Sequence, residues 1–217
     1  MRFEGHESYF VVFPAERSTK ERATRADKNN FPSLEFVLVL EGPWDASFDP
    51  EWGGPAQITF DTLKDWTERE ERGIKYYSGI ATYRKTFDLP ADLMNRSEFY
   101  IDLGTVFDLA RVTINGEDRG VLWTAPRRKK ITDCLRAGEN LLVIEVVNRW
   151  PNRLIGDQHP PDADARTVKM PAGLLGCREF KTGRYTFAVR HPFTSESRLL
   201  PSGLIGPVRI LADPTGD

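Results

Sequence analysis

The sequence has few of the residues from which disulfide frameworks and metal sites are built: its 217 residues include two cysteines and three histidines. Cys134 and Cys177 fit neither a dense disulfide framework nor a CxxC metal clip, so we expect both to be free and buried, with one bridge between them as the alternative. His6, His159 and His191 are far apart in the sequence, and each lacks a companion at metal-ligand spacing. These scarcities argue against a disulfide-rich scaffold and against a histidine metal centre.

Long hydrophobic runs and a strong net charge are absent as well. No segment approaches the roughly 18 consecutive apolar residues of a membrane helix, and residues 1–6 lack the apolar core of a secretory signal. The formal net charge of −2 argues against a nucleic-acid partner. The one basic run, residues 127–130, is interpreted as the solvated start of a strand, with a phosphate-binding patch as the alternative. The composition therefore predicts a soluble globular protein with neither a membrane nor a nucleic acid as partner.

Motifs of common catalytic and metal sites are missing too. Ser78-Gly79 and Ser202-Gly203 are typical of turns or strand starts and do not form a G-x-S-x-G elbow. Asp162-Ala163-Asp164 begins like a calcium loop, but the glycine and the distal glutamate of an EF-hand do not follow.

What the sequence does contain is a series of strand patterns, of which residues 76–90 give the longest. Apolar side chains recur there at every second position, at Ala81, Tyr83, Phe87 and Leu89. This alternation predicts a half-buried antiparallel strand, which Pro90 ends because proline cannot donate to a sheet ladder.

Shorter strands are predicted along the rest of the chain, at residues 9–13, 35–40, 57–60, 99–103, 110–114, 141–147, 185–189 and 208–211. Asn115-Gly116 predicts a hairpin, whose return strand carries Val121 and Leu122. Single helical turns are expected at 61–66, capped by Asp61, and at 131–138, ended by Gly138, and a turn is expected at 202–207. Residues 141–147 are apolar on both faces apart from Glu145, which indicates a central strand. Strands at this spacing without alternating helices predict an all-β fold, a jelly-roll β-sandwich.

The chain divides into three parts by composition. Residues 1–13 are interpreted as the strand tail of a preceding domain, residues 14–33 as a charged linker, and residues 34–217 as the sandwich. Within the sandwich, residues 148–178 are rich in proline and show almost no periodicity, which is typical of a segment that forms a site or an interface.

Four spaced motifs carry a family resemblance, at residues 77–87, 112–116 with Gly120, 135–146 and 202–210. In this order, over residues 73–211, they resemble the sugar-binding, galactose-binding-like β-sandwich of family-two-type glycoside hydrolases. Residues 40–44, with Leu63, Asp65 and Trp66, more particularly resemble the C-terminal module of α-L-rhamnosidase-like enzymes.

The resemblance implies a part of a polysaccharide-degrading hydrolase and not a complete enzyme. In such enzymes the catalytic carboxylates lie in a separate barrel domain, and this chain has no run of βα units long enough to be one. The implied partners are an oligo- or polysaccharide and the catalytic barrel domain of the parent enzyme, and the implied location is periplasmic, cell-surface or secreted in a bacterium. No organic cofactor is expected, and the fold resemblance permits a structural calcium without locating it.

Sugar binding requires an aromatic face for the apolar side of the ring and planar polar groups for its hydroxyls. Both kinds gather after the predicted central strand and at its rim, in a candidate site that comprises Asn148, Arg149, Trp150, Asn152, Arg153, Asp157, Gln158, Trp123, Tyr76 and Tyr77. The alternative for Trp150 is that it plugs the edge of the sandwich. Trp44, Trp52 and Trp66 are expected to pack in the core.

We therefore expect a non-catalytic carbohydrate-binding module with no catalytic residue of its own. One alternative is a structural brace, in which residues 148–178 pack on the catalytic domain without touching sugar. A further alternative is a self-contained glycosidase that uses Asp157 and a nearby carboxylate, the pair of acids that glycoside hydrolysis requires.

Overall fold

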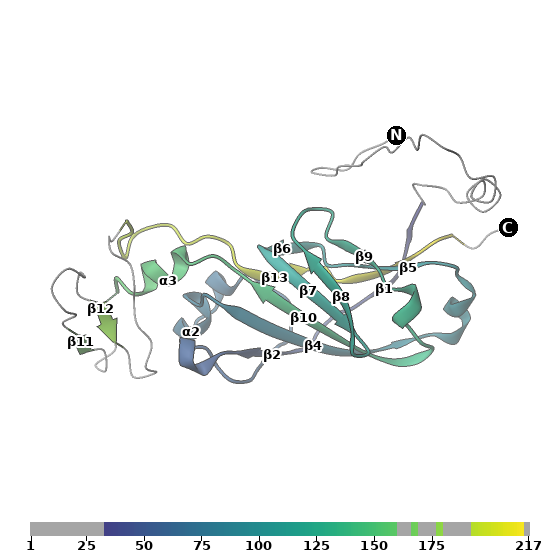
Figure 1. Cartoon of the computed structure of the whole chain (residues 1–217), viewed down its shortest axis with the longest axis horizontal. Coiled ribbons are helices and arrows are strands. Elements are labelled where there is room, and N and C mark those ends of the chain that lie inside the picture. Colours follow the sequence, from purple (N-terminus) through teal and green to yellow (C-terminus); the bar gives the residue numbers. More distant parts are fainter. Residues whose placement is uncertain (1–32, 160–165, 169–176, 180–191, 215–217) are drawn as a thin grey trace, which may run out of the picture.

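The structure, a computed structural model, describes residues 33–159, 166–168, 177–179 and 192–214. Two antiparallel sheets lie face to face and form a β-sandwich (Figure 1), as the strand spacing predicts. One sheet has the order β1 (Glu35–Val39), β14 (Arg209–Ala212), β5 (Phe99–Asp102) and β9 (Arg128–Lys130). The other has the order β3 (Ile58–Phe60), β2 (Trp44–Phe48), β4 (Ile80–Leu89), β10 (Gly138–Val147), β7 (Leu109–Ile114) and β8 (Glu117–Leu122).

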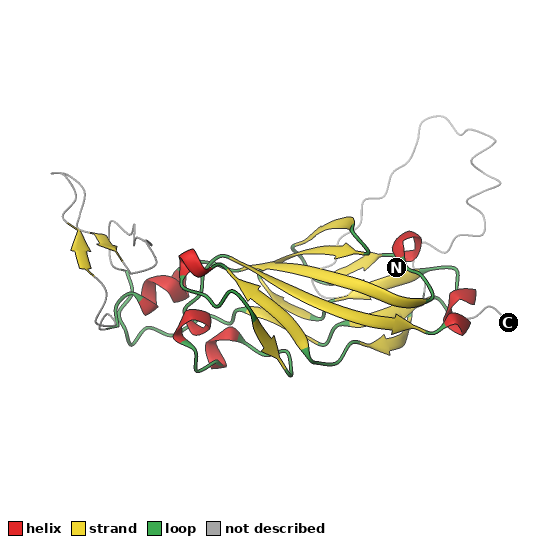
Figure 2. Ribbon diagram, turned by 90° about the horizontal axis from the view of Figure 1, so that it is seen from below, coloured by secondary structure: helices red, strands yellow, loops and turns green. Residues whose placement is uncertain are grey.

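Short elements connect these strands, mostly at the ends of the sandwich (Figure 2). They are the 3-10 turns η1 (Pro50–Trp52), η2 (Trp66–Glu68), η3 (Ala91–Asn95) and η4 (Thr132–Cys134), and the helices α2 (Arg72–Lys75) and α3 (Pro151–Gly156). Two small strand pairs complete the described chain: β6 (Thr105–Phe107) with β13 (Gly203–Gly206), and β11 (Arg166–Val168) with β12 (Cys177–Glu179). No helix in these described ranges is long and apolar enough to span a membrane.

The core lies between the two sheets and follows the predicted alternation. On β4 the side chains of Ala81, Tyr83, Phe87 and Leu89 are buried, as the sequence pattern predicts. β10 lies between β4 and β7 and buries every second side chain from Asn140 onward. Its central position is therefore confirmed.

An aromatic cluster ties the six-stranded sheet to the loops at one end. The indole Nε1 of Trp66 donates to the phenolic oxygen of Tyr83, and both side chains are fully buried. Trp66 also contacts Phe48 edge-on, with ring centroids 5.2 Å apart. A side chain at Gly203 would collide with the Trp66 indole, because a Cβ built there lies 2.3 Å from Nε1. The expected burial of Trp44 and Trp66 is confirmed.

The hairpin at Asn115-Gly116 is confirmed, since φ is 52° at Asn115 and 86° at Gly116. The Asn115 amide nitrogen donates to the Cys134 carbonyl and to the Asn140 side chain, so it joins the turn to the segment before β10. Cys134 is free and buried, as expected. The side chain of Cys177 lies outside the described residues.

Three local predictions are wrong. The helical turn expected at 61–66 lies at η2 instead, where Asp65 and not Asp61 caps it by accepting from the Thr67 amide. The segment 202–207, which is expected to form a turn, contains strand β13. Its glycines suggest a turn, but Gly203 and Gly206 pair with β6. Gly138 begins β10 and does not end a helix, which is confined to η4.

Strand β2 was not predicted, although its burial alternates. Residues of low strand propensity, Asp45, Ala46 and Ser47, mask the pattern between two buried aromatics. The basic run forms strand β9, in which Arg128 pairs with Asp102 at 3.0 Å and Lys130 pairs with Glu98. The predicted strands at 9–13 and 185–189 and most of the predicted linker lie outside the described residues.

We predict that Tyr83→Phe lowers the free energy of unfolding by about 1–3 kcal/mol, because the buried Trp66 N–H loses its acceptor. Thr86→Val, which removes an exposed hydroxyl from the same strand, should stay within about 0.5 kcal/mol. Urea denaturation followed by circular dichroism measures both values. Equal stability of the two variants would contradict a structural role for this hydrogen bond.

Candidate functional site

One end of the six-stranded sheet brings the candidate residues together. Register pairs there join Phe48 to Ala81, Val147 to both Ile80 and Leu109, and Leu122 to Ala110. The segments that follow β2, β10 and β8 therefore meet the segments that precede β4 and β7. Residues 76–77, 123 and 148–158 all lie at this end, as the sequence analysis expects.

Three of the five tryptophans are exposed, and all three lie in segments that leave the sheet at this end. The exposed fractions are 40% for Trp52, 70% for Trp123 and 56% for Trp150. The expectation that Trp52 packs in the core is wrong. It lies in η1, capped by the Asp49 side chain, and the Arg153 guanidinium covers its ring at 5.4 Å from the centroid.

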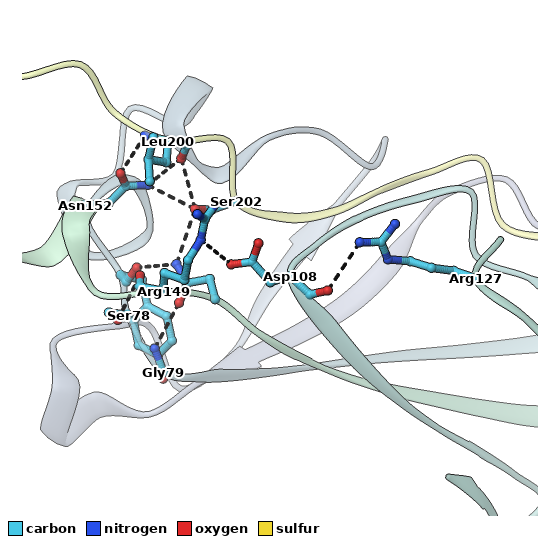
Figure 3. A network of polar contacts seen from close by, with 10 residues as sticks. Ser78, Gly79, Asp108, Arg127, Arg149, Asn152, Leu200 and Ser202 are labelled. Atoms are coloured by element: carbon cyan, nitrogen blue, oxygen red, sulfur yellow. Dashed lines mark hydrogen bonds and ion pairs between the residues drawn. The ribbon is translucent and has the colours of Figure 1, made fainter. Parts of the chain in front are cut away.

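The Asn148 side chain is buried and serves the fold. Its amide nitrogen donates to the Tyr77 carbonyl at 2.8 Å and to Ser202 Oγ at 3.3 Å, and its oxygen accepts from the Gly79 amide at 3.1 Å. Figure 3 labels Gly79 and Ser202, two of the residues that Asn148 binds. Asn148 thus fixes three chain segments to one another.

Asn152 on α3 extends the same network (Figure 3). Its amide nitrogen donates to the Leu200 carbonyl and to Ser202 Oγ, and its oxygen accepts from the Leu200 amide at 2.7 Å. Ser202 is bound in turn by Asp65, whose carboxylate accepts from the Ser202 amide at 3.0 Å. The two asparagines therefore hold α3, the end of β10 and the approach to β13 as one unit.

The Arg149 side chain lies at the surface and contacts a residue that the sequence analysis missed. Its Nε lies 2.8 Å from Asp108 Oδ2, and its side chain is 59% exposed. Arg127 donates to the Asp108 carbonyl at 3.3 Å from the other side (Figure 3). The sequence offered only weak signals for these two residues: Asp108 lies two positions before the predicted strand 110–114, and Arg127 begins the basic run.

Arg153 and Asp157 face inward as an i, i+4 pair on α3, with Nε and Oδ1 3.9 Å apart. Arg153 donates from Nη1 to the Trp52 carbonyl at 2.8 Å, and both Arg153 and Asp157 are buried. Burial lowers the pKa of Arg153 to about 10, against the opposing effect of the Asp157 charge. Asp157 pairs with a guanidinium, which differs from the paired carboxylates of a glycosidase.

The two tyrosines have different environments. Tyr77 is buried, donates to the Ile80 carbonyl and accepts from the Asp49 amide, and burial raises its pKa. Tyr76 is half-buried, with its hydroxyl 3.0 Å from His159 Nε2. Gln158, also half-buried, donates to the Leu154 carbonyl at 3.4 Å. Within the described ranges, no three histidine, cysteine, aspartate or glutamate side chains gather into a metal-binding group.

Comparisons with known proteins identify the type of domain. No protein-family model matches the chain. A Formosa agariphila protein that is provisionally named a beta-glucuronidase is 36% identical over 212 residues, which are 95% of this chain and 18% of that protein. The solved structure of a rhamnosidase from Novosphingobium sp. PP1Y matches 86% of this chain at 34% identity with a TM-score of 0.69.

More distant structures share the fold alone. The β-glucuronidase from Ruminococcus gnavus in complex with D-glucuronic acid matches 87% of this chain at 18% identity, with a TM-score of 0.55. This chain spans 18% of the Formosa protein, 16% of the Novosphingobium chain and 31% of the Ruminococcus chain. The chain is therefore homologous to a β-sandwich domain that forms a minor part of large glycoside hydrolases.

Proposed function

We propose that this chain is a non-catalytic carbohydrate-binding domain of a multidomain, rhamnosidase-like glycoside hydrolase. The observation that carries the proposal is the gathering of Trp52, Trp123 and Trp150, all exposed, at one end of the sandwich. Large aromatic side chains normally contribute buried area, and their exposure at one place favours a ligand that covers them.

Sugar rings suit such a surface because their C–H faces are apolar and their hydroxyls are polar. An indole supplies the apolar platform. Arg149 directly precedes Trp150 in the sequence and forms an exposed ion pair with Asp108. This pair supplies guanidinium donors and carboxylate acceptors for the hydroxyls. Direct contact is therefore assigned to Trp150, Arg149, Asp108 and Trp123.

The buried candidates have a supporting role in this proposal. Polar side-chain atoms form hydrogen bonds within the protein in Asn148, Asn152 and Tyr77. The Arg153 guanidinium packs against the Trp52 ring. The names of the relatives suggest rhamnose- and glucuronate-containing glycans as ligands. The catalytic barrel would lie elsewhere in the parent polypeptide, in a periplasmic, cell-surface or secreted bacterial enzyme.

A second candidate function, a structural brace, is favoured by an aliphatic row on the outer face of the six-stranded sheet. Ile80 is 54% exposed and Leu109 is 38% exposed, and both pair with Val147, which lies between them. Val121 on β8 is exposed nearby. Aliphatic side chains on a flat sheet offer hydroxyls no partner, so this row suits a neighbouring protein domain better than sugar.

We predict that Trp150→Ala raises the dissociation constant for the bound glycan at least tenfold, a loss of about 1.4 kcal/mol. The assay titrates the chain with rhamnose-, galactose- and uronate-containing oligosaccharides and follows tryptophan fluorescence. Phe36→Ala is the matched control, since Phe36 is an exposed aromatic residue on the other sheet.

The outcomes separate the candidate functions. Saturable binding that Trp150→Ala weakens and Phe36→Ala leaves unchanged supports the proposal. A folded chain that binds no member of the panel contradicts it and favours the brace. Release of reducing sugar by the chain alone, abolished by Asp157→Asn, would establish the self-contained glycosidase instead.

We also predict that Asn148→Ala lowers the free energy of unfolding by about 2–4 kcal/mol, because the Tyr77 carbonyl and the Gly79 amide lose the partner that Asn148 supplies and Ser202 Oγ loses one of its bonds. Asn95→Ala, at an exposed position of η3, should change it by less than about 0.5 kcal/mol. Thermal and urea unfolding measure both variants. Unchanged stability together with lost glycan binding would instead make Asn148 a direct sugar contact.

A further inference from the structure

Contacts and short stretches of chain link the exposed tryptophans across the end of the sandwich. In the order of these links, the row comprises Trp52, Arg153, Trp150, Arg149, Asp108, Arg127 and Trp123. The three tryptophans and Arg149 are exposed, whereas Arg153 is buried.

Observed contacts and chain connections fix this order. Trp52 is covered by the guanidinium of Arg153 and accepts its hydrogen bond at 2.8 Å. Arg153 lies one helical turn beyond Trp150, where the Leu154 amide donates to the Trp150 carbonyl at 3.1 Å. The first half of the row is therefore held by α3 and η1.

The second half depends on Asp108. Its carboxylate pairs with Arg149, the neighbour of Trp150, at 2.8 Å, and its carbonyl accepts from Arg127 at 3.3 Å (Figure 3). Trp123 directly follows β8, whose last residue pairs with Ala110 at the start of β7. Asp108 thus joins the α3 side of the row to the Trp123 side.

The length of the row follows from the strand order. Trp52 lies beyond the end of β2 and Trp123 beyond the end of β8, and the order β2-β4-β10-β7-β8 places four strand spacings between them. At about 4.8 Å for each spacing, strands β2 and β8 lie about 19 Å apart. This distance is several times the width of one pyranose ring, so a ligand that spans from one strand end to the other is longer than one sugar unit.

We propose that the ligand is an extended oligosaccharide segment that lies across the strand ends, roughly perpendicular to the strands. Trp52, Trp150 and Trp123 form three stacking positions for successive parts of the glycan, and Arg149 with Asp108 binds hydroxyls between the second and third positions. Arg153 is a positioning residue that holds the Trp52 ring from its buried side. This inference rests on the proposed carbohydrate-binding function and adds the length and direction of the ligand.

The test measures affinity for di-, tetra- and hexasaccharides of one rhamnose- and uronate-containing polymer by calorimetry. We expect the hexasaccharide to bind at least tenfold more tightly than the disaccharide. Trp123→Ala and Trp52→Ala should each remove most of this gain and leave disaccharide affinity unchanged, whereas Trp150→Ala should weaken both ligands. Phe36→Ala again serves as the matched control.

Because Trp52→Ala uncovers the buried Arg153, Trp52→Phe provides a second variant that keeps a ring over the guanidinium. Trp52→Phe should lose less affinity for the hexasaccharide than Trp52→Ala does. Acrylamide quenching gives an independent measurement: the hexasaccharide should protect more of the quenchable tryptophan emission than the disaccharide.

Equal affinity for all lengths, or a length gain that survives both outer substitutions, would overturn the extended site and leave sugar binding itself intact. Absence of binding at every length would refute both the proposed function and this inference.

Discussion

The hydrogen bonds of the buried Asn148 side chain are the interaction on which the end of the sandwich with the candidate site depends. Directly after β10, the Asn148 side chain binds the Tyr77 carbonyl and the Gly79 amide in the segment before β4. It also donates to Ser202 in the approach to β13. Because buried polar groups are costly when they lack a partner, this amide fixes how three segments meet. The exposed side chains beyond it are then carried on a rigid base.

A division between buried polar groups and exposed aromatic groups follows from this base. The buried side of α3 presents Asn152 and Arg153 to the protein, while Trp150, directly before the helix, is exposed. Within one short segment, Asn152 and Arg153 therefore contact the protein interior, whereas Trp150 is exposed to solvent. Trp150 directly precedes the helix that carries Arg153, and Arg153 contacts Trp52, so α3 connects the two tryptophans.

The sequence predicts local patterns well and non-local placement poorly. The alternation of apolar residues predicted β4, and the apolar run at 141–147 predicted β10, because both patterns are contained in the residues of the strand itself. It could not decide whether Trp52 is buried or exposed, because that depends on an arginine 101 residues away in the chain. The Asp108 site was missed for the same reason: Arg149 and Asp108 are 41 residues apart and meet only through the pairing of β7 with β10. The candidate segment was therefore predictable, but its division into structural and exposed residues was not.

Under the proposed function, the exposed ion pair of Arg149 and Asp108 serves glycan recognition more than stability of the fold. A solvent-exposed salt bridge contributes about 0–1 kcal/mol, so its removal would cost the fold little. Asp108 also accepts from Arg127 at its main-chain carbonyl, which adds a second contact to this residue. The Asp108 carboxylate and the Arg149 guanidinium lie side by side and together offer an acceptor and donors. A sugar hydroxyl both donates and accepts hydrogen bonds. It can therefore bind the carboxylate and the guanidinium while these two groups remain paired with each other.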